Sequence, residues 1–149
     1  MASTIRPPSP DDFAGWKALW ASYLVFYETD LYSEHTTELW QRILDPHQTT
    51  SCRLAEKDGQ LIGLVHFFPH PDTWDRRLTC YLQDLYVKEG FRGEGVGEAL
   101  IGAVVDRARE EGWSGVYWLT ADDNHQARGL YDKLTGGASG FIAYELDID

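Results

Sequence analysis

Four glycines lie within eight residues of this chain, from Gly90 to Gly97. They follow an apolar stretch typical of a strand and precede apolar residues at helical spacing. Glycine permits tight turns and close approach of a ligand, and the first turn of a helix presents free N–H groups at its positive end. The segment therefore predicts an anion site suited to a pyrophosphate, with Arg92 as a charged clamp.

The glycine pattern differs from two common phosphate-binding motifs. A P-loop ends in Gly-Lys-Ser or Gly-Lys-Thr, and this loop does not. A dinucleotide-binding Gly-x-Gly-x-x-Gly motif starting at Gly93 fails because Glu98 occupies its sixth position. The segment contains Arg-x-x-Gly-x-Gly instead, from Arg92 to Gly97. The alternative is a glycine-rich surface turn without a ligand.

Hydrophobic periodicity and turn residues predict alternating strands and helices around this loop. Strands are expected at residues 4–6, 51–55, 61–68, 78–87, 116–119 and 141–148. Helices are expected at residues 13–27 and 36–44, from the glycine cluster to residue 111, and at 124–134. Asp58-Gly59 predicts a hairpin turn, and residues 69–72 are expected to form an interruption between the strands at 61–68 and 78–87. This order predicts an α/β fold, a mixed sheet with helices on its faces.

Length and charge restrict the class of protein. A chain of 149 residues is long enough for one domain with a real core. Thirteen basic against 24 acidic residues give a formal charge of −11, which argues against nucleic-acid binding and against docking on an anionic membrane. No run approaches the length of a membrane span, and the N-terminus lacks the pattern of a signal peptide, so we expect a cytoplasmic protein.

Residues 92–97, in their place between strand and helix, resemble the acetyl-CoA pyrophosphate loop of the GNAT family of N-acetyltransferases. The likeness covers roughly the whole chain and is strongest from Leu82 to Tyr131. It implies a single domain over residues 1–149, with a mostly antiparallel central sheet flanked by helices. It also implies acetyl-CoA as co-substrate, no metal, and transfer of an acetyl group to a primary amine by direct attack while both substrates are bound.

Two further segments resemble motifs of that family. Gln83 to Val87 looks like the fourth strand, where a bulge splays the sheet and the backbone holds the pantetheine arm. Asn124-x-x-Ala-x-x-Leu-Tyr131 looks like the second cofactor motif, with the tyrosine as general acid. A phenol, with an ordinary pKa of about 10, suits protonation of a leaving thiolate. The resemblance implies the cofactor-binding residues Leu85, Tyr86, Val87, Arg92, Gly93, Glu94, Gly95, Val96, Gly97, Asn124 and Tyr131. Taken singly, Asn124 could be only a helix N-cap and Tyr131 only a core residue.

The acceptor side of the site is less determined by the sequence. Asp84 is the candidate base, with a structural carboxylate at the bulge as an equal alternative, and Tyr81 could belong to a water chain. Tyr27, Glu28 and His66 are further candidate substrate residues. Each has a structural alternative: surface residues for the first two and a satisfied core histidine for His66. A metal site is not expected.

The pattern of aromatic residues is similar to a subgroup of the family, the yeast-type histone and other-protein acetyltransferases. That subgroup includes enzymes that acetylate D-amino acids and polyamines, so small amines, amino acids and basic peptides are all expected acceptors. The rival interpretation is a non-catalytic acyl-CoA sensor on the same fold. Five residues, 135–139, separate Leu134 from Gly140-Phe141, where the family commonly has none. This departure leaves the usual terminal hairpin in doubt and suggests a homodimer that protects the sheet edge.

Overall fold

The computed structural model describes residues 2–31 and 33–148. The chain forms two compact units, residues 1–118 and 119–149. In chain order, the elements of the first unit are β1 (Thr4–Arg6), the 3-10 turn η1 (Pro10–Asp12), α1 (Phe13–Phe26), α2 (Ser33–Leu44), β2 (Ser51–Lys57), β3 (Gln60–Asp72), β4 (Asp75–Val87), α3 (Val96–Glu111) and β5 (Val116–Tyr117). The second unit contains α4 (His125–Thr135).

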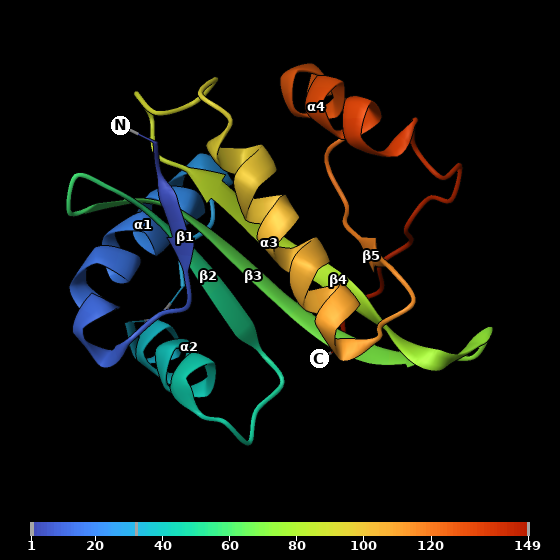
Figure 1. Cartoon of the computed structure of the whole chain (residues 1–149), viewed down its shortest axis with the longest axis horizontal. Helices are drawn as coiled ribbons and strands as arrows, with labels where there is room; N and C mark the ends of the chain where they lie inside the picture. Colours follow the sequence, from blue (N-terminus) through green and yellow to red (C-terminus); the bar gives the residue numbers. More distant parts are fainter. Residues whose placement is uncertain (1, 32, 149) are drawn as a thin grey trace. The chain divides into compact units, whose positions relative to one another are not determined.

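The sheet has five strands in the order β1-β2-β3-β4-β5, and its first four strands pair antiparallel (Figure 1). The strand β5 runs parallel to β4, which requires a crossover, and α3 is that crossover. The predicted α/β fold with a mostly antiparallel sheet flanked by helices is therefore confirmed.

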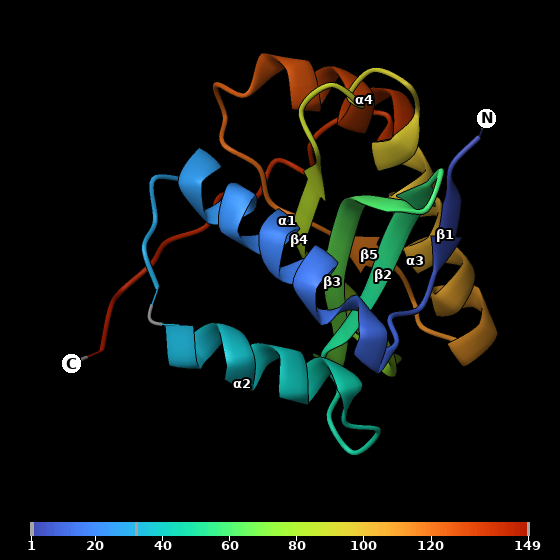
Figure 2. The same ribbon diagram turned by 90° about the vertical axis from the view of Figure 1, so that its left-hand side faces the viewer.

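Helices cover both faces of the sheet (Figure 2). On one face, α1 and α2 contribute Trp16, Leu19, Trp20, Leu39, Trp40 and Ile43 to a core shared with β2, β3 and β4. The rings of Trp16 and Trp40 lie 4.8 Å apart at the centre of this core. On the other face, α3 buries its apolar stripe against the three middle strands. The aromatic face predicted for the first helix is thus a packing face over most of its length.

Gly63 in β3 allows α3 to approach the sheet closely. A Cβ atom at this position would lie 3.1 Å from a methyl carbon of Leu100 and 3.1 Å from the carbonyl oxygen of Tyr86. Because α3 begins directly after the glycine loop, this close packing fixes where the loop lies relative to β4.

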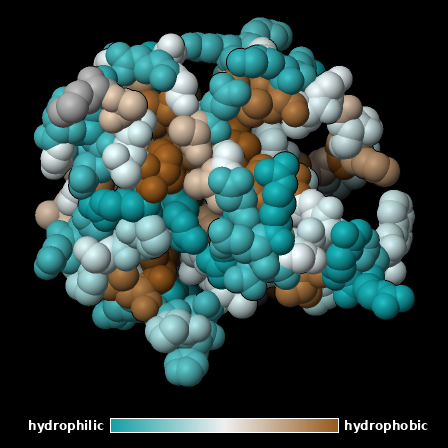
Figure 3. All heavy atoms as spheres, viewed as in Figure 1, coloured by the Kyte–Doolittle hydropathy of each residue, from teal (hydrophilic) through white to brown (hydrophobic). Residues whose placement is uncertain are grey.

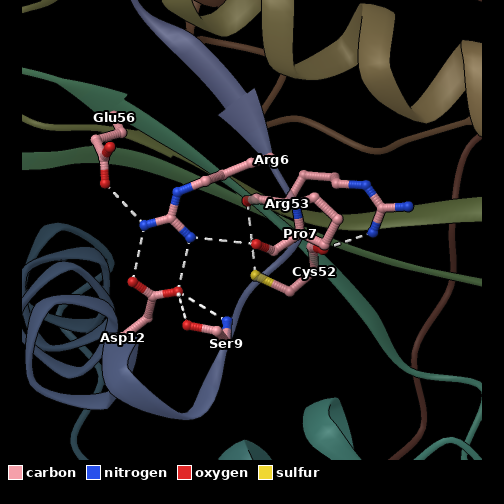
Figure 4. Close-up of polar contacts among 7 residues, drawn as sticks. All are labelled: Arg6, Pro7, Ser9, Asp12, Cys52, Arg53 and Glu56. Atoms are coloured by element: carbon pink, nitrogen blue, oxygen red, sulfur yellow. Dashed lines mark hydrogen bonds and ion pairs between the residues drawn. The ribbon is translucent and has the colours of Figure 1, made fainter.

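An ion-pair network anchors the start of α1 to the edge of the sheet (Figure 4). The Arg6 guanidinium donates to both carboxylate oxygens of Asp12, at 2.8 and 2.9 Å, and to Glu56 at 2.8 Å. The backbone N–H of Ser9 also donates to Asp12, which completes a capping box at the helix entry. These bonds, led by the one from Arg6, lower the pKa of Asp12 to about 2.

The strands β3 and β4 are longer than predicted. The expected interruption at Pro69 to Asp72 is wrong, because β3 continues to Asp72 and β4 begins at Asp75. The pairing of β2 with β3 ends where Ser51 meets Phe67 of β3. Beyond this point β3 pairs with β4 alone, so Pro69 and Pro71 lie in a stretch of β3 that has a free edge. A proline is tolerated at such an edge because its missing N–H removes no ladder bond.

The predicted strand at residues 141–148 is also wrong: the structure has no strand there. Its alternating apolar residues Ile142, Tyr144, Leu146 and Ile148 are all exposed, as is Phe141. The pattern has the period of a strand, but a strand needs a neighbour to pair with.

The space-filling view shows a largely hydrophilic surface with separate hydrophobic patches on the visible face (Figure 3).

Candidate active site

The edge of β4 beyond its pairing with β5 is open within the described residues. The two strands pair only at Cys80 and Tyr81. His66 then pairs with Asp84 but Phe67 with Leu82, so Gln83 is an extra residue in β4. This bulge lies where the resemblance implies one.

The bulge determines which backbone groups face the open edge. The N–H of Lys88 donates to Ile62 of β3 at 2.7 Å, so it points toward β3. Because backbone groups alternate along a strand, Leu85 and Val87 direct their N–H and C=O groups to the opposite, open edge. The bond from Arg92 to the Val87 carbonyl oxygen, 2.8 Å long, agrees with this direction. Leu85 and Val87, which the resemblance implies hold the pantetheine arm, therefore present backbone hydrogen-bond donors and acceptors at the open edge.

The glycine loop continues from this edge into α3. Gly93 and Gly95 have φ angles of +81° and +83°, a region that favours glycine. A Cβ atom at either position would meet nothing within 4 Å, so the surface above the loop is open. Gly95 is the N-cap of α3 and has no side chain with which to cap the first turn. This cradle of backbone N–H groups fits a pyrophosphate.

Arg92 lies differently from the predicted phosphate clamp. Its Nε donates to Val87, and its guanidinium lies over the rings of Tyr86 and Phe26, at 5.4 and 5.5 Å from the ring centroids. The side chain thus connects the loop with the C-terminal end of α1. Glu94 forms an exposed ion pair with Lys57 on β2, at 3.4 Å. The backbone N–H groups of the loop are therefore one source of anion binding, and the role of Arg92 as a charged clamp stays a prediction.

Asp84 is the polar centre of the face that α1 covers. Its Oδ1 accepts a hydrogen bond from the Tyr23 hydroxyl at 2.8 Å, and its Oδ2 lies 3.0 Å from His66 Nδ1. The Asp84 side chain is 15% exposed, so solvent or a substrate can reach it. Burial, and next the negative charge of Asp84, raise the pKa of Tyr23, which stays a hydrogen-bond donor. The same two causes raise the pKa of Tyr27.

His66 is the satisfied core histidine of the structural alternative. It is 3% exposed, and its second ring nitrogen, Nε2, accepts a hydrogen bond from Trp16 Nε1 at 3.0 Å. Both ring nitrogens are used within the protein, which leaves none for a substrate. His66 therefore has a structural role in the core, in place of the expected contact with a substrate.

The other predicted acceptor residues are Tyr27 and Glu28, directly after α1, and Tyr81 on β4. The Tyr27 ring is half exposed and 4.8 Å from Tyr23. Tyr81 stacks on Tyr117 at 5.0 Å and lies edge-to-face with Phe68. Glu28 is exposed in the turn after α1, with a φ of +53°.

Three residues gain importance from the structure that sequence reasoning did not give them. Trp16 and Tyr23 lie in the helix predicted at residues 13–27, and Tyr117 lies in the strand predicted at residues 116–119. Tyr117 bonds to His70 Nε2 at 2.7 Å. The signal for Tyr23 was available in principle, because an aromatic residue with a polar tip shares the α1 face with Tyr27. Nothing in the sequence indicates that this tip meets Asp84.

The two cysteines are buried and free. Burial raises the pKa of the Cys52 thiol, and it raises the pKa of Cys80 to about 11. Both thiols are therefore protonated at neutral pH, which does not favour a cysteine nucleophile. Within residues 2–31 and 33–148, no group of three His, Cys, Asp or Glu side chains could hold a metal ion. None of the described helices is both long enough and apolar enough to span a membrane.

Asn124 and Tyr131 belong to the second unit. Asn124 is the N-cap of α4, and its side-chain oxygen accepts a hydrogen bond from the Ala127 N–H at 3.4 Å. Asn124 is thus a helix N-cap, which is the structural alternative to a cofactor contact. Tyr131 lies seven residues farther along, so two helical turns place both residues on one side of α4.

Known proteins share this fold and this sequence pattern. Residues 15–136 match the model of the acetyltransferase (GNAT) family. The D-amino-acid N-acetyltransferase HPA3 of Saccharomyces cerevisiae is 36% identical over 132 residues, 87% of this chain and 82% of that protein. The L-ornithine N5-acetyltransferase NATA1 of Arabidopsis thaliana is 30% identical over 104 residues, 70% of this chain and 45% of that protein.

Among solved structures, AAC(6')-Iy in complex with the bisubstrate analogue CoA-S-monomethyl-acetylneamine superimposes with a TM-score of 0.86. It covers all of both chains at 17% identity, and so it supports the fold alone. Taken with the family match and the relatives, these similarities show that the chain belongs to the acetyltransferase (GNAT) family and is an N-acetyltransferase.

Proposed function

We propose that this enzyme transfers the acetyl group of acetyl-CoA to a primary amine by direct attack, with both substrates bound at once. The observation that carries the proposal is the continuity of the open edge of β4 with the glycine cradle at the start of α3. Asp84 lies on the same strand, immediately after the bulge. One strand thus adjoins a cradle for an anion and carries an acidic group suited to a cation.

The cofactor side works through the backbone. The N–H groups of residues 93–97, with Glu94 and Val96 included, bind the pyrophosphate at the helix N-terminus. Leu85 and Val87 hold the pantetheine arm along the open edge, beside Tyr86. The N–H of Leu85 is the donor for the carbonyl oxygen, whose negative charge grows during attack. When bound, acetyl-CoA supplies the thioester carbon that the amine nitrogen attacks.

The acceptor side works through side chains. Asp84 attracts the ammonium form of the substrate and accepts its proton, directly or through water, before the nitrogen attacks. Tyr27, Tyr81 and Glu28 contribute aromatic faces and charge that suit a cationic amine. A carbon–nitrogen bond forms as the carbon–sulfur bond breaks, and Tyr131 donates its phenolic proton to the departing sulfur. The second proton that the nitrogen releases on becoming an amide restores the phenol through water, and Asp84 gives the first proton to solvent. Asn124 supports the cofactor from the same helix as Tyr131.

The acceptor class that we propose is an amino acid or a polyamine. The yeast and plant relatives are named for D-amino acids and for L-ornithine, which carry the primary ammonium group that Asp84 suits. The acidic balance of the chain also favours cationic substrates by long-range attraction.

We also propose that the active form is a homodimer. The exposed alternating residues of segment 141–148 have the pattern of a strand that a second copy would pair with and cover. Sedimentation of the full chain should give twice the mass of one chain. A monomer at all concentrations would remove this part of the proposal.

The test of the function is release of free thiol from acetyl-CoA in the presence of single amines. The panel contains polyamines, L- and D-amino acids, aminoglycosides and a basic peptide. We expect turnover with amino acids or polyamines, and mass spectrometry should show a gain of one acetyl group on the nitrogen. Binding of acetyl-CoA without turnover on any amine would favour the sensor, and absence of binding would overturn the proposal.

A further inference from the structure

A buried chain of hydrogen bonds ends at Asp84. It runs from Trp16 Nε1 to His66 Nε2, and from His66 Nδ1 to the Asp84 carboxylate, which also accepts from Tyr23. We propose that Trp16 and His66 are positioning residues for acetyl transfer, which fix the orientation of the Asp84 carboxylate and keep the imidazole out of proton transfer. This inference rests on the proposed role of Asp84.

The donor chemistry of tryptophan determines the tautomer of His66. An indole N–H can only donate, so the imidazole Nε2 must offer its lone pair. The ring proton then resides on Nδ1, which donates to Asp84 Oδ2 at 3.0 Å. A proton on both nitrogens would place the Nε2–H against the indole N–H. Trp16 is fully buried and His66 is 3% exposed, so water cannot replace the missing acceptor at low cost.

The same series of hydrogen bonds also fixes the orientation of the Asp84 carboxylate. One carboxylate oxygen accepts from the Tyr23 hydroxyl and the other from the imidazole N–H. The two donated hydrogen bonds, one on each oxygen, fix the rotamer of the carboxylate. Each oxygen keeps a lone pair, and the 15% of the side chain that is exposed can meet an ammonium group. The arrangement uses histidine as a rigid spacer between a core indole and the site.

Several other groups lie near this histidine. On α1, the Trp20 ring lies edge-to-face with the imidazole, with 5.2 Å between the ring centroids, and Tyr23 shares Asp84 as hydrogen-bond partner. On β2, Cys52 is the cross-strand neighbour of His66, and its raised pKa keeps it neutral. On β4, Asp84 carries the negative charge. Among these groups, the Trp16 indole is the one that donates a hydrogen bond to Nε2 and so requires a lone pair there.

The first test observes the tautomer in the full-length enzyme without any substrate. Long-range nitrogen–proton correlation of 15N-labelled protein distinguishes the two imidazole nitrogens by their shifts and couplings. We expect His66 to show a protonated Nδ1 and an unprotonated Nε2. The opposite tautomer would overturn the inference independently of any activity.

The second test separates hydrogen bonding from packing with a matched pair of variants. In His66→Gln, the amide can donate to Asp84 and accept from Trp16, while His66→Leu can do neither. With both variants folded, as judged by circular dichroism, we expect His66→Leu to lower kcat/KM for the amine at least about tenfold, and His66→Gln to recover most of that loss. The KM for acetyl-CoA should stay constant. Equal rates in the two variants would contradict the inference.

Asp84→Asn distinguishes failure of the inference from failure of the proposed function. A wild-type rate in this variant would refute the role of Asp84 itself. A strong loss there, together with a wild-type rate in folded His66→Leu, would refute only the positioning chain.

Discussion

The two sides of the proposed site are built from different material. The cofactor side consists of backbone: an open strand edge, glycines at positive φ and an uncapped helix start. The acceptor side consists of side chains that meet across three elements, with Asp84 at the centre. The cofactor side should therefore tolerate most side-chain substitutions but not a change of backbone conformation. The acceptor side should be sensitive to substitution of the side chains that form it.

The largest effect is expected where a backbone conformation is lost. Gly95→Val places a β-branched residue at a φ of +83°, which strains the cradle and the start of α3. We expect calorimetry to show loss of acetyl-CoA binding. Gly102→Ala is the matched control on the same helix, because its Cβ would meet nothing within 4 Å. Retained affinity in Gly95→Val would show that the cradle does not bind the cofactor.

The next effect tests the acceptor side alone. Asp84→Asn removes the charge and keeps the shape, and we expect kcat/KM for the amine to fall about 100-fold with unchanged affinity for acetyl-CoA. Asp75→Asn, near the start of the same strand, serves as the control. A parallel loss of cofactor affinity in Asp84→Asn would mean that the two sides are not separable.

Tyr131 tests whether the second unit contributes chemistry. Tyr131→Phe removes only a hydroxyl, so turnover should fall by about 10²-fold while acetyl-CoA affinity stays within twofold of the wild type. Stopped-flow measurement of thiol release in a single turnover separates chemistry from product release. An unchanged rate would remove the acid from the proposal.

The smallest effect concerns a contact that anchors α1 outside the site. The pKa of Asp12 is lowered in the folded state to about 2, so its stabilising effect is present above its ordinary value of 3.8 and is lost as the pH falls toward 2. Asp12→Asn should lower the free energy of unfolding by roughly 1 to 2 kcal/mol at pH 7. The difference from the wild type should shrink below pH 4, and kcat/KM at 25 °C should not change. Urea titrations at pH 2.5, 4 and 7 measure this, and a difference independent of pH would contradict it.

The fold was largely predictable because its signals are local. The spacing of apolar residues, the Asp58-Gly59 turn and the glycine before α3 each specify an element within a short window. The errors have a common cause. Pro69 continues a strand because β2 has already ended, and segment 141–148 does not form one because nothing in the described chain pairs with it. Both depend on neighbours that a local pattern does not contain.

The candidate site divides in the same way. The glycine loop is visible in the sequence because it lies in one continuous stretch, and the family resemblance of residues 83–87 implied the bulge that the structure has at Gln83. The acceptor side is not, because its hydrogen bonds join residues 16 and 66, 23 and 84, and 66 and 84. Sequence alone could name Asp84 and His66 as candidates. It could not show that a tryptophan holds the histidine.

The most direct test of the central claim is a calorimetric titration of acetyl-CoA into the wild-type chain in the absence of any amine. It needs no knowledge of the acceptor. The backbone-built cradle predicts saturable binding of one acetyl-CoA per chain, which free pyrophosphate should weaken by competition. A titration without saturable binding would contradict the assignment of the loop and, with it, the proposed reaction.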